Sequence, residues 1–349
     1  MLAHRHQKAS AYKTANEQPV DKHIEMKLLM TVSGVLAALL LAALFIEGIL
    51  RLGFGFGRPP LYVADETMGY RLAPNQRLRR FGNRIHINEY SMRANAIAPK
   101  PTPQTLRLFL LGDSLANGNW WTDQANILSA LIAQALQPSF IASSNTSPYT
   151  HAEALNASAN SWGPRNELAY LQRYGTFDAT VLVLLLNTDD LFGTEPTSLQ
   201  VGRDRSYPSQ NFPFAIAEIF HRFTTKNQPI PGLKAIQNEG GDRVGKNLTA
   251  INGIYQQTTA AGSQFLLVLS PLKRELPGPR DYELVARQRL QDWATENNAR
   301  YTDLLPSFVQ QSDPATLYRD HIHLSPAGNE LVSQTIAEDI AKILALPQD

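Results

Sequence analysis

The sequence contains no cysteine among its 349 residues. This absence excludes disulfide bonds, zinc–thiolate sites and cysteine nucleophiles. A charge excess of one sign is lacking too, because 32 lysines and arginines balance 31 aspartates and glutamates to a net charge of +1. Nucleic-acid binding as a main function therefore has no electrostatic basis. Neither the histidines nor the glycines have the spacing of a metal site or a phosphate loop, so we expect no metal and no cofactor.

A long uncharged segment lies near the N-terminus. Residues 28–46 hold no charged side chain, and the apolar character continues to residue 50. As a helix of about 1.5 Å per residue it would reach about 34 Å, enough to cross a hydrocarbon core of about 30 Å. A cleaved signal peptide has a shorter apolar region, and a buried core helix is apolar along one stripe only. We favour a transmembrane anchor over residues 28–50, with the lipid bilayer as its partner and those two readings as alternatives.

The charges around this segment bear on its orientation. Lysines precede it and Arg51 and Arg58 follow it, so the positive-inside signal is weak. Residues 1–27 are polar and mixed in charge, which is typical of a disordered tail. Because so short a tail would stay in the cytoplasm while the large domain crossed, we predict a single-pass membrane protein. Its main domain would be extracytoplasmic, on the periplasmic or cell-surface side.

Two further regions follow the anchor. Residues 51–105 form an arginine-rich connector that ends in a proline-rich run at 99–103. Such a run cannot be helical and indicates a stiff tether. Over residues 106–347, short apolar runs alternate with helical patterns, as in a parallel sheet covered by helices on both faces. We therefore predict an α/β domain, a three-layer α/β/α sandwich with a mostly parallel sheet.

The pattern also locates the individual elements. Strands are expected at 106–111, at a short segment that ends near 155, at 180–186, at 265–269 and near 301–305. Helices are expected from 127, over 168–174, at about 244–261 and 281–297, and after the N-cap Ser325. Residues 191–243 interrupt the alternation and contain one helical patch at about 213–223. An insertion of this length is typical of a lid or binding loop. We interpret its Arg203, Arg205 and Tyr207 as a solvated loop face, with sugar or anion contact as the alternative.

The run Gly-Asp-Ser-Leu at 112–115 directly follows the first strand. At the carboxyl end of a strand in a doubly wound sheet, a residue lies at the edge of the ligand crevice. A serine that opens a turn there exposes its hydroxyl and directs its amide N–H outward, as an acyl-transfer nucleophile requires. Turns are rich in these residue types, so the run alone also fits an ordinary turn.

A second motif lies just before the last helix. Asp320 precedes His323 by three residues. An unperturbed histidine titrates near pH 6.5, which suits a general base at neutral pH, and a nearby carboxylate would fix its tautomer. A satisfied loop histidine beside a turn-capping aspartate is the alternative for this motif taken alone.

Together, the two motifs resemble those of the SGNH/GDSL hydrolase family. That family has a strand followed by Gly-Asp-Ser as its first motif and Asp-x-x-His before the final helix as its last. The resemblance covers about residues 45–345, because segments 69–75 and 87–93 look like the connector of bacterial membrane-anchored members. It implies an SGNH/GDSL-type serine hydrolase with Ser114 as nucleophile, His323 as base and Asp320 as the residue that orients the histidine.

The family's two middle motifs, which supply oxyanion donors, differ here from its pattern. The glycine of the second motif falls on Ser161, or on Gly163 if the register slips by two, and serine is strained where φ is positive. The asparagine of the third motif falls on Asp189, whose ionised carboxylate would repel an oxyanion. Asn187 could serve instead, since two residues apart in an extended strand point to the same side. A protonated Asp189 could also donate, and the sequence leaves both open.

The resemblance implies a carboxylic ester as substrate. We expect an esterase that removes acetyl or other short acyl groups from an envelope glycan or a lipid. An O-acyltransferase on exported polysaccharide would use the same residues with a sugar acceptor in place of water. A binding or scaffold protein with a decayed site is a third alternative, because of Ser161 and Asp189. Trp120 and Trp121 would either line an acyl or glycan pocket or serve as packing residues. The sequence predicts no oligomeric state.

Overall fold

The computed structural model describes residues 22–137, 148–224 and 228–344. Its contacts divide the chain into two units, Met1–Ile49 and Leu50–Asp349. Helix α1 (Lys22–Leu52) has no buried residue and is long and apolar enough to cross a bilayer. A membrane anchor and a signal sequence both fit such a helix. Of the tail predicted over residues 1–27, residues 22–27 belong to α1, and the others lie outside the described residues.

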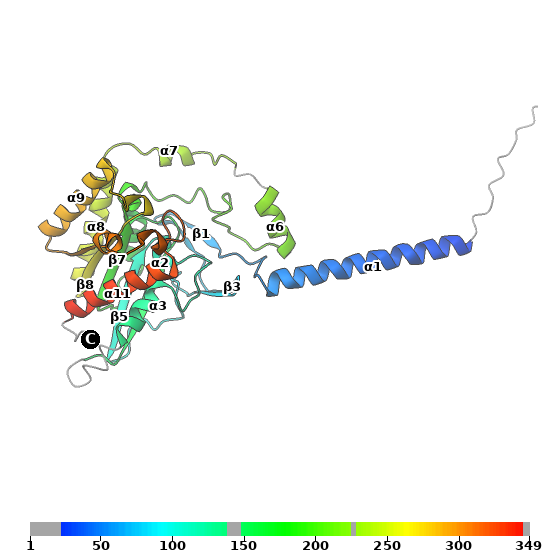
Figure 1. The fold of residues 1–349 in the computed structure, drawn as a ribbon, viewed down its shortest axis with the longest axis horizontal. Helices are drawn as coiled ribbons and strands as arrows, with labels where there is room; N and C mark the ends of the chain where they lie inside the picture. Colours follow the sequence, from blue (N-terminus) through cyan, green and yellow to red (C-terminus); the bar gives the residue numbers. More distant parts are fainter. Residues whose placement is uncertain (1–21, 138–147, 225–227, 345–349) are drawn as a thin grey trace, which may run out of the picture. The chain divides into compact units, whose positions relative to one another are not determined.

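Five strands form the central sheet of the second unit, in the order β6-β5-β7-β8-β9. Three of them, β5, β7 and β8, are labelled in Figure 1. All neighbouring strands are parallel, because a helical segment returns the chain to the same edge between them. The predicted parallel sheet is confirmed, although β6 runs to Ser158 and does not end near 155. The strands are β5 (Thr105–Gly112), β6 (His151–Ser158), β7 (Val181–Asn187), β8 (Gln264–Ser270) and β9 (Arg300–Asp303).

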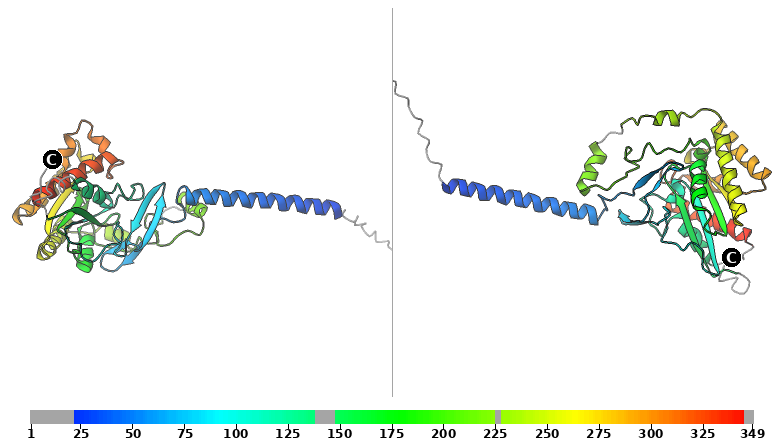
Figure 2. Two further views of the ribbon diagram at one scale, coloured as in Figure 1. Left: turned by 90° about the horizontal axis from the view of Figure 1, so that it is seen from below. Right: turned by 180° about the vertical axis from the view of Figure 1, so that it is seen from behind.

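Helices cover both faces of this sheet, and β7 shows why. Its residues alternate, so that Leu182, Leu184 and Leu186 join one hydrophobic cluster while Val183 and Leu185 join the other. Figure 2 (left) shows α11 on one side of the sheet and α5 and α8 on the other. The three-layer α/β/α architecture is confirmed. The first cluster includes α5 (Pro164–Tyr174), α8 (Arg243–Ala260) and α9 (Asp281–Glu296), and the second includes α3 (Leu128–Ala135), α10 (Leu305–Val309) and α11 (Pro326–Ile343).

The connector is a folded part of the second unit. It forms two antiparallel hairpins, β1 (Tyr62–Asp65) with β2 (Gly69–Leu72), and β3 (Gln76–Arg80) with β4 (Asn83–Ile87). Its buried apolar side chains, such as Met68 and Ile85, belong to the first hydrophobic cluster of the α/β sheet. The two hairpins pack against the domain, so the connector as a whole is not a tether. A stiff tether can apply only to the non-helical proline run at 99–103.

The insertion at 191–243 begins within a short 3₁₀ helix, η1 (Thr188–Phe192). A mostly irregular segment leads to α6 (Ala215–Thr224), which confirms the helical patch predicted at about 213–223. A second short helix, α7 (Leu233–Gln237), was not predicted, because five residues give too little periodicity to detect. Both α6 and α7 lie along the outside of the unit in Figure 1.

Candidate active site

Ser114 lies at the carboxyl end of β5, where the chain turns into the short helix α2 (Ser114–Asn117). Asp113 caps this helix, since its Oδ1 accepts a hydrogen bond from the Leu115 amide at 2.8 Å. The close approach of two strands requires Gly112, because a Cβ there would lie 2.7 Å from the carbonyl oxygen of Leu185. The local sequence thus sets the backbone that presents the serine hydroxyl.

His323 and Asp320 lie in the loop before α11, whose N-cap is Ser325 as predicted. Nε2 of His323 lies 3.1 Å from Ser114 Oγ, and its Nδ1 lies 2.8 Å from Asp320 Oδ2. Both distances are those of hydrogen bonds, and their order is that of a Ser-His-Asp triad. Folding thus brings together two motifs that are 209 residues apart in sequence.

The environment of Asp320 keeps it ionised. Its Oδ1 accepts hydrogen bonds from the amides of Ile322 and His323 at 2.9 and 2.8 Å. Burial alone would raise the pKa of Asp320, but these amides and the His323 ring outweigh burial and lower it to about 2. At neutral pH the carboxylate therefore favours the tautomer in which Nδ1 of His323 carries the proton and Nε2 can accept one from Ser114.

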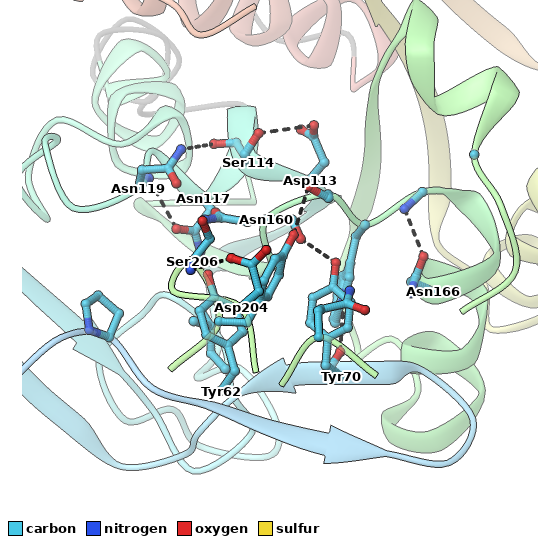
Figure 3. A pocket seen from close by; sticks show the side chains of 18 of the residues that line it. Tyr62, Tyr70, Asp113, Ser114, Asn117, Asn119, Asn160, Asn166, Asp204 and Ser206 are labelled. Atoms are coloured by element: carbon cyan, nitrogen blue, oxygen red, sulfur yellow. Dashed lines mark hydrogen bonds between the residues drawn. The ribbon is translucent and has the colours of Figure 1, made fainter. Parts of the chain in front are cut away.

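A cavity of about 930 Å³ opens beside Ser114. Tyr62 and Tyr70 lie on β1 and β2, across the cavity from Ser114 (Figure 3). Trp120 and Trp121 also line it, which supports the pocket reading of these two residues. The Trp121 ring lies edge-on to His323 at 5.0 Å. Side-chain amides and carboxyls complete a polar and aromatic wall, among them Asn117, Asn119, Asn160, Asn166 and Asp204.

A profile of the GDSL-like Lipase/Acylhydrolase family matches residues 110–331, a span that contains both motifs. The chain belongs to this family. Membership makes the protein an SGNH-type serine hydrolase and makes an ester its class of substrate.

Several solved structures match this chain at low identity. The α/β hydrolase LAE5 from the metagenome of Lake Arreo, Spain, shares 12% identity over 70% of this chain and 96% of its own, with a TM-score of 0.45. The acetylxylan esterase Axe2 from Geobacillus stearothermophilus shares 12% over 72% and 98%, with a TM-score of 0.44. The esterase EstA from Pseudoalteromonas sp. shares 15% over 69% and 99%, with a TM-score of 0.39. A search of curated proteins found no match.

Ser161, the residue expected at the family's oxyanion glycine, has a left-handed backbone conformation, with φ of 57°. This is the region that glycine tolerates and serine adopts only under strain, of order 1–3 kcal/mol. The Ser161 amide has no hydrogen-bond partner within the described part of the chain. Its N–H is thus available as a hydrogen-bond donor.

Tyr207 of the insertion holds this serine. Its hydroxyl donates to Ser161 Oγ at 3.0 Å, and its ring packs against Tyr62 and Tyr70 with centroids 5.1 and 5.0 Å apart. Tyr70 in turn donates to the carbonyl of Asn160 at 2.6 Å. The solvated-face interpretation is therefore wrong for Tyr207, whereas Arg203 and Arg205 are exposed as expected. Sequence reasoning missed Tyr70 as well, since nothing local links residue 70 to residue 160.

Neither Asn187 nor Asp189 offers a free donor. The chain turns into η1 at Thr188, so the extended geometry expected at 187–189 is wrong: Asn187 caps the helix, and its Oδ1 accepts from the Asp189 amide. Nδ2 of Asn187 donates to Asp113 and Asp190, at 3.0 and 2.8 Å. The Asp189 carboxylate pairs with Arg274 at 2.5 Å, so its oxygens act as acceptors for the guanidinium group.

Three buried carboxyl groups surround the nucleophile turn. Asp113 and Asp190 share the Asn187 amide, and Glu167 is fully buried with neither oxygen hydrogen-bonded in the described chain. Burial raises the pKa of Asp113 to about 6 and those of Asp190 and Glu167 well above their usual range. Because the pKa of Asp113 is raised on folding, the stability that this group contributes is present below about pH 4 and is lost as the pH rises through about 6. The raised pKa values of Asp190 and Glu167 act in the same direction.

The contact between Tyr207 and Ser161 leads to a first prediction. Tyr207→Phe keeps the ring but removes the bond to Ser161 Oγ, and it should lower kcat about tenfold with little change in KM. Ser161→Gly should restore most of this loss, because glycine adopts a positive φ without strain. Kinetics of both single variants and the double variant on p-nitrophenyl acetate test the expectation. Tyr282→Phe, at an exposed tyrosine, serves as control. If Tyr207→Phe lowers kcat by the same factor in Ser161→Gly as in the wild type, the contact between Tyr207 and Ser161 is not the cause of the loss.

Proposed function

We propose that this protein is a membrane-anchored serine esterase that removes O-acyl groups of the acetyl type from an envelope glycan or a lipid. Ser114 is its nucleophile, His323 its general base and Asp320 the residue that orients the base. The observation that carries the proposal is the continuous hydrogen-bonded series of Ser114, His323 and Asp320 at the edge of the cavity.

In the proposed reaction, His323 Nε2 takes the Ser114 proton as Oγ attacks the ester carbonyl carbon. The carbonyl oxygen becomes an oxyanion that the amides of Ser114 and Ser161 receive. When this intermediate collapses, the alcohol leaves with the proton from His323, and the acyl group stays on Ser114. Water, activated by the same histidine, then releases the acid and restores the free hydroxyl.

The lining of the cavity favours a glycan ester over a lipid ester. Tyrosine and tryptophan rings alternate there with amide and carboxyl groups, which suits a ligand with apolar ring faces and many hydroxyls. A long acyl chain would instead need an extended apolar channel. The volume of about 930 Å³ exceeds what an acetyl group requires, so room remains for the sugar that carries it.

Anchoring and location form the second part of the proposal. Residues 28–50 span the bilayer, and the α/β domain lies on its extracytoplasmic side. The length and composition of α1 support this reading.

Covalent labelling tests the nucleophile. The full chain in detergent should react with a fluorophosphonate probe and turn over p-nitrophenyl acetate, and Ser114→Ala should lose both, with the label mapped to the Ser114 peptide by mass spectrometry. Ser312→Ala, at an exposed loop serine, is the matched control and should keep both. A folded wild-type protein that neither labels nor turns over would overturn the proposal. Adding an acceptor sugar distinguishes hydrolysis from O-acyl transfer, which the spare cavity volume also permits.

A further inference from the structure

Helix α6 in the insertion has a face of exposed aromatic side chains. Phe220 is 69% exposed and Phe223 87% exposed, and Phe214, just before the helix, is 61% exposed. On the opposite face, Ala215 and Glu218 are fully buried. A helix with one charged, anchored face and one aromatic face is typical of segments that lie in the interface of a bilayer.

The inner face of α6 is fixed by a buried charge. The Glu218 carboxylate accepts hydrogen bonds from the Gly57 amide at 2.6 Å, from Arg80 at 2.8 and 3.0 Å and from Arg222 at 2.9 Å. Burial alone would raise the pKa of Glu218, but these partners outweigh it and lower the pKa. Turning the aromatic face inward would break this buried ion pair and leave its charges unpaired. The phenylalanines therefore stay exposed in the folded unit.

The segment just before α6 is bonded to the end of the apolar helix α1 and to the residues that follow it. Nη2 of Arg51 donates to the carbonyl of Pro213 at 2.6 Å, and the Phe212 amide donates to the carbonyl of Gly57 at 3.0 Å. Arg51 is in the last turn of α1. If residues 28–50 cross the bilayer, Arg51 lies at its surface, and α6 is bonded to the chain at that level.

Other side chains at the same place fit a lipid surface. Phe54 and Phe81 are 41% and 44% exposed, and the Phe54 ring lies 5.9 Å from that of Phe81, which is at the tip of the β3–β4 hairpin. Leu52 is 86% exposed. Exposed arginines flank these residues in sequence, at Arg58, Arg77 and Arg79, where guanidinium groups could pair with phosphate headgroups.

We propose that α6, together with Phe54 and Phe81, is a second contact of this protein with the membrane. The aromatic face of α6 lies among the headgroups and the first acyl carbons, while Glu218 holds the helix to the domain. This proposal rests on the membrane anchoring proposed above. It implies that the insertion, which supplies Tyr207 to the active site, is positioned by the bilayer as well as by the protein.

Site-directed spin labelling tests this contact, and the absence of cysteine makes each label unique. The full chain is reconstituted in vesicles of phosphatidylcholine and phosphatidylglycerol with a nitroxide at Phe220→Cys, at Leu36→Cys within α1, or at Val285→Cys. Val285 is the matched control, an apolar residue on α9 that is 61% exposed. Collision with oxygen, which concentrates in lipid, is compared with collision with a water-soluble nickel chelate. The Phe220 and Leu36 labels should favour oxygen several-fold relative to the Val285 label.

The three labels separate the two proposals. A Leu36 label in lipid with a Phe220 label as water-exposed as that at Val285 would overturn the α6 contact and leave the anchor intact. A Leu36 label in water would overturn the anchor and the α6 contact together. Each labelled variant must retain fluorophosphonate reactivity, and Phe223→Cys gives a second site on the same face if Phe220→Cys does not.

Discussion

Replacing His323 by alanine should lower kcat for ester hydrolysis by about three orders of magnitude or more. His323 Nε2, 3.1 Å from Ser114 Oγ, is the group positioned to accept the proton as the serine attacks. Loss of a triad base leaves only the residual rate that oxyanion donors and binding supply. Steady-state kinetics on p-nitrophenyl acetate measure the effect. His151→Ala is the control, because His151 lies exposed at the opposite end of the sheet from Ser114. Near-normal turnover without His323 would remove it from the mechanism.

Asp320→Asn should also lower kcat, by about two to four orders of magnitude, because the His323 ring remains but its tautomer is no longer fixed. The pKa of about 2 also gives a stability signature. Since the folded-state pKa lies below the usual value near 3.9, the carboxylate stabilises the fold above about pH 4, and this contribution is lost as the pH falls towards 2. The difference in free energy of unfolding between wild type and Asp320→Asn should therefore shrink over that range.

The second large effect is expected at Arg93, for stability. Arg93 is 1% exposed and donates hydrogen bonds to the backbone carbonyls of Asn117 (2.7 Å), Asn119 and Thr122, in the loop that follows the nucleophile. Burial lowers its pKa to about 10, so it remains charged. Arg93→Met should lower the free energy of unfolding by about 3 kcal/mol or more, because three carbonyls lose their donor at about 1–3 kcal/mol each.

Denaturant unfolding of Arg93→Met against Arg84→Met provides the comparison. Arg84 pairs with Asp123 on the exposed surface, where solvent screening leaves such a pair with little effect on stability. Because the loop held by Arg93 carries Trp120 and Trp121, kcat/KM should fall at least about tenfold in Arg93→Met. A loss of stability no larger than that of Arg84→Met, with unchanged kcat/KM, would show that the loop does not depend on Arg93.

The sheet could be predicted from sequence because buried parallel strands are apolar on both faces. The run at 181–186 is apolar throughout, and the structure places β7 at Val181–Asn187 in the middle of the sheet. The hairpins of the connector gave a weaker signal. Polar residues alternate with apolar ones in Asn83–Ile87 but not in Gln76–Arg80, and only packing against the α/β core reveals which side is buried.

The candidate oxyanion residues were likewise predicted from the sequence only in part. The sequence identified Ser161 as the departure from glycine, and the structure gave it the positive φ that makes the departure costly. It could not find Tyr207, which bonds to a residue 46 positions away. It also could not choose between Asn187 and Asp189, because their orientation depends on where β7 ends and η1 begins.

The sequence by itself determined the α/β class, the family and the two motifs that hold Ser114, Asp320 and His323. Each of these depends on residues close together in the chain, where spacing, turn chemistry and capping act locally. Only the tertiary structure decided that Nε2 of His323 reaches Ser114, that Arg93 holds the next loop, and that Tyr207 steadies Ser161. These contacts join segments far apart in sequence, and their partners are set by how strands and helices pack.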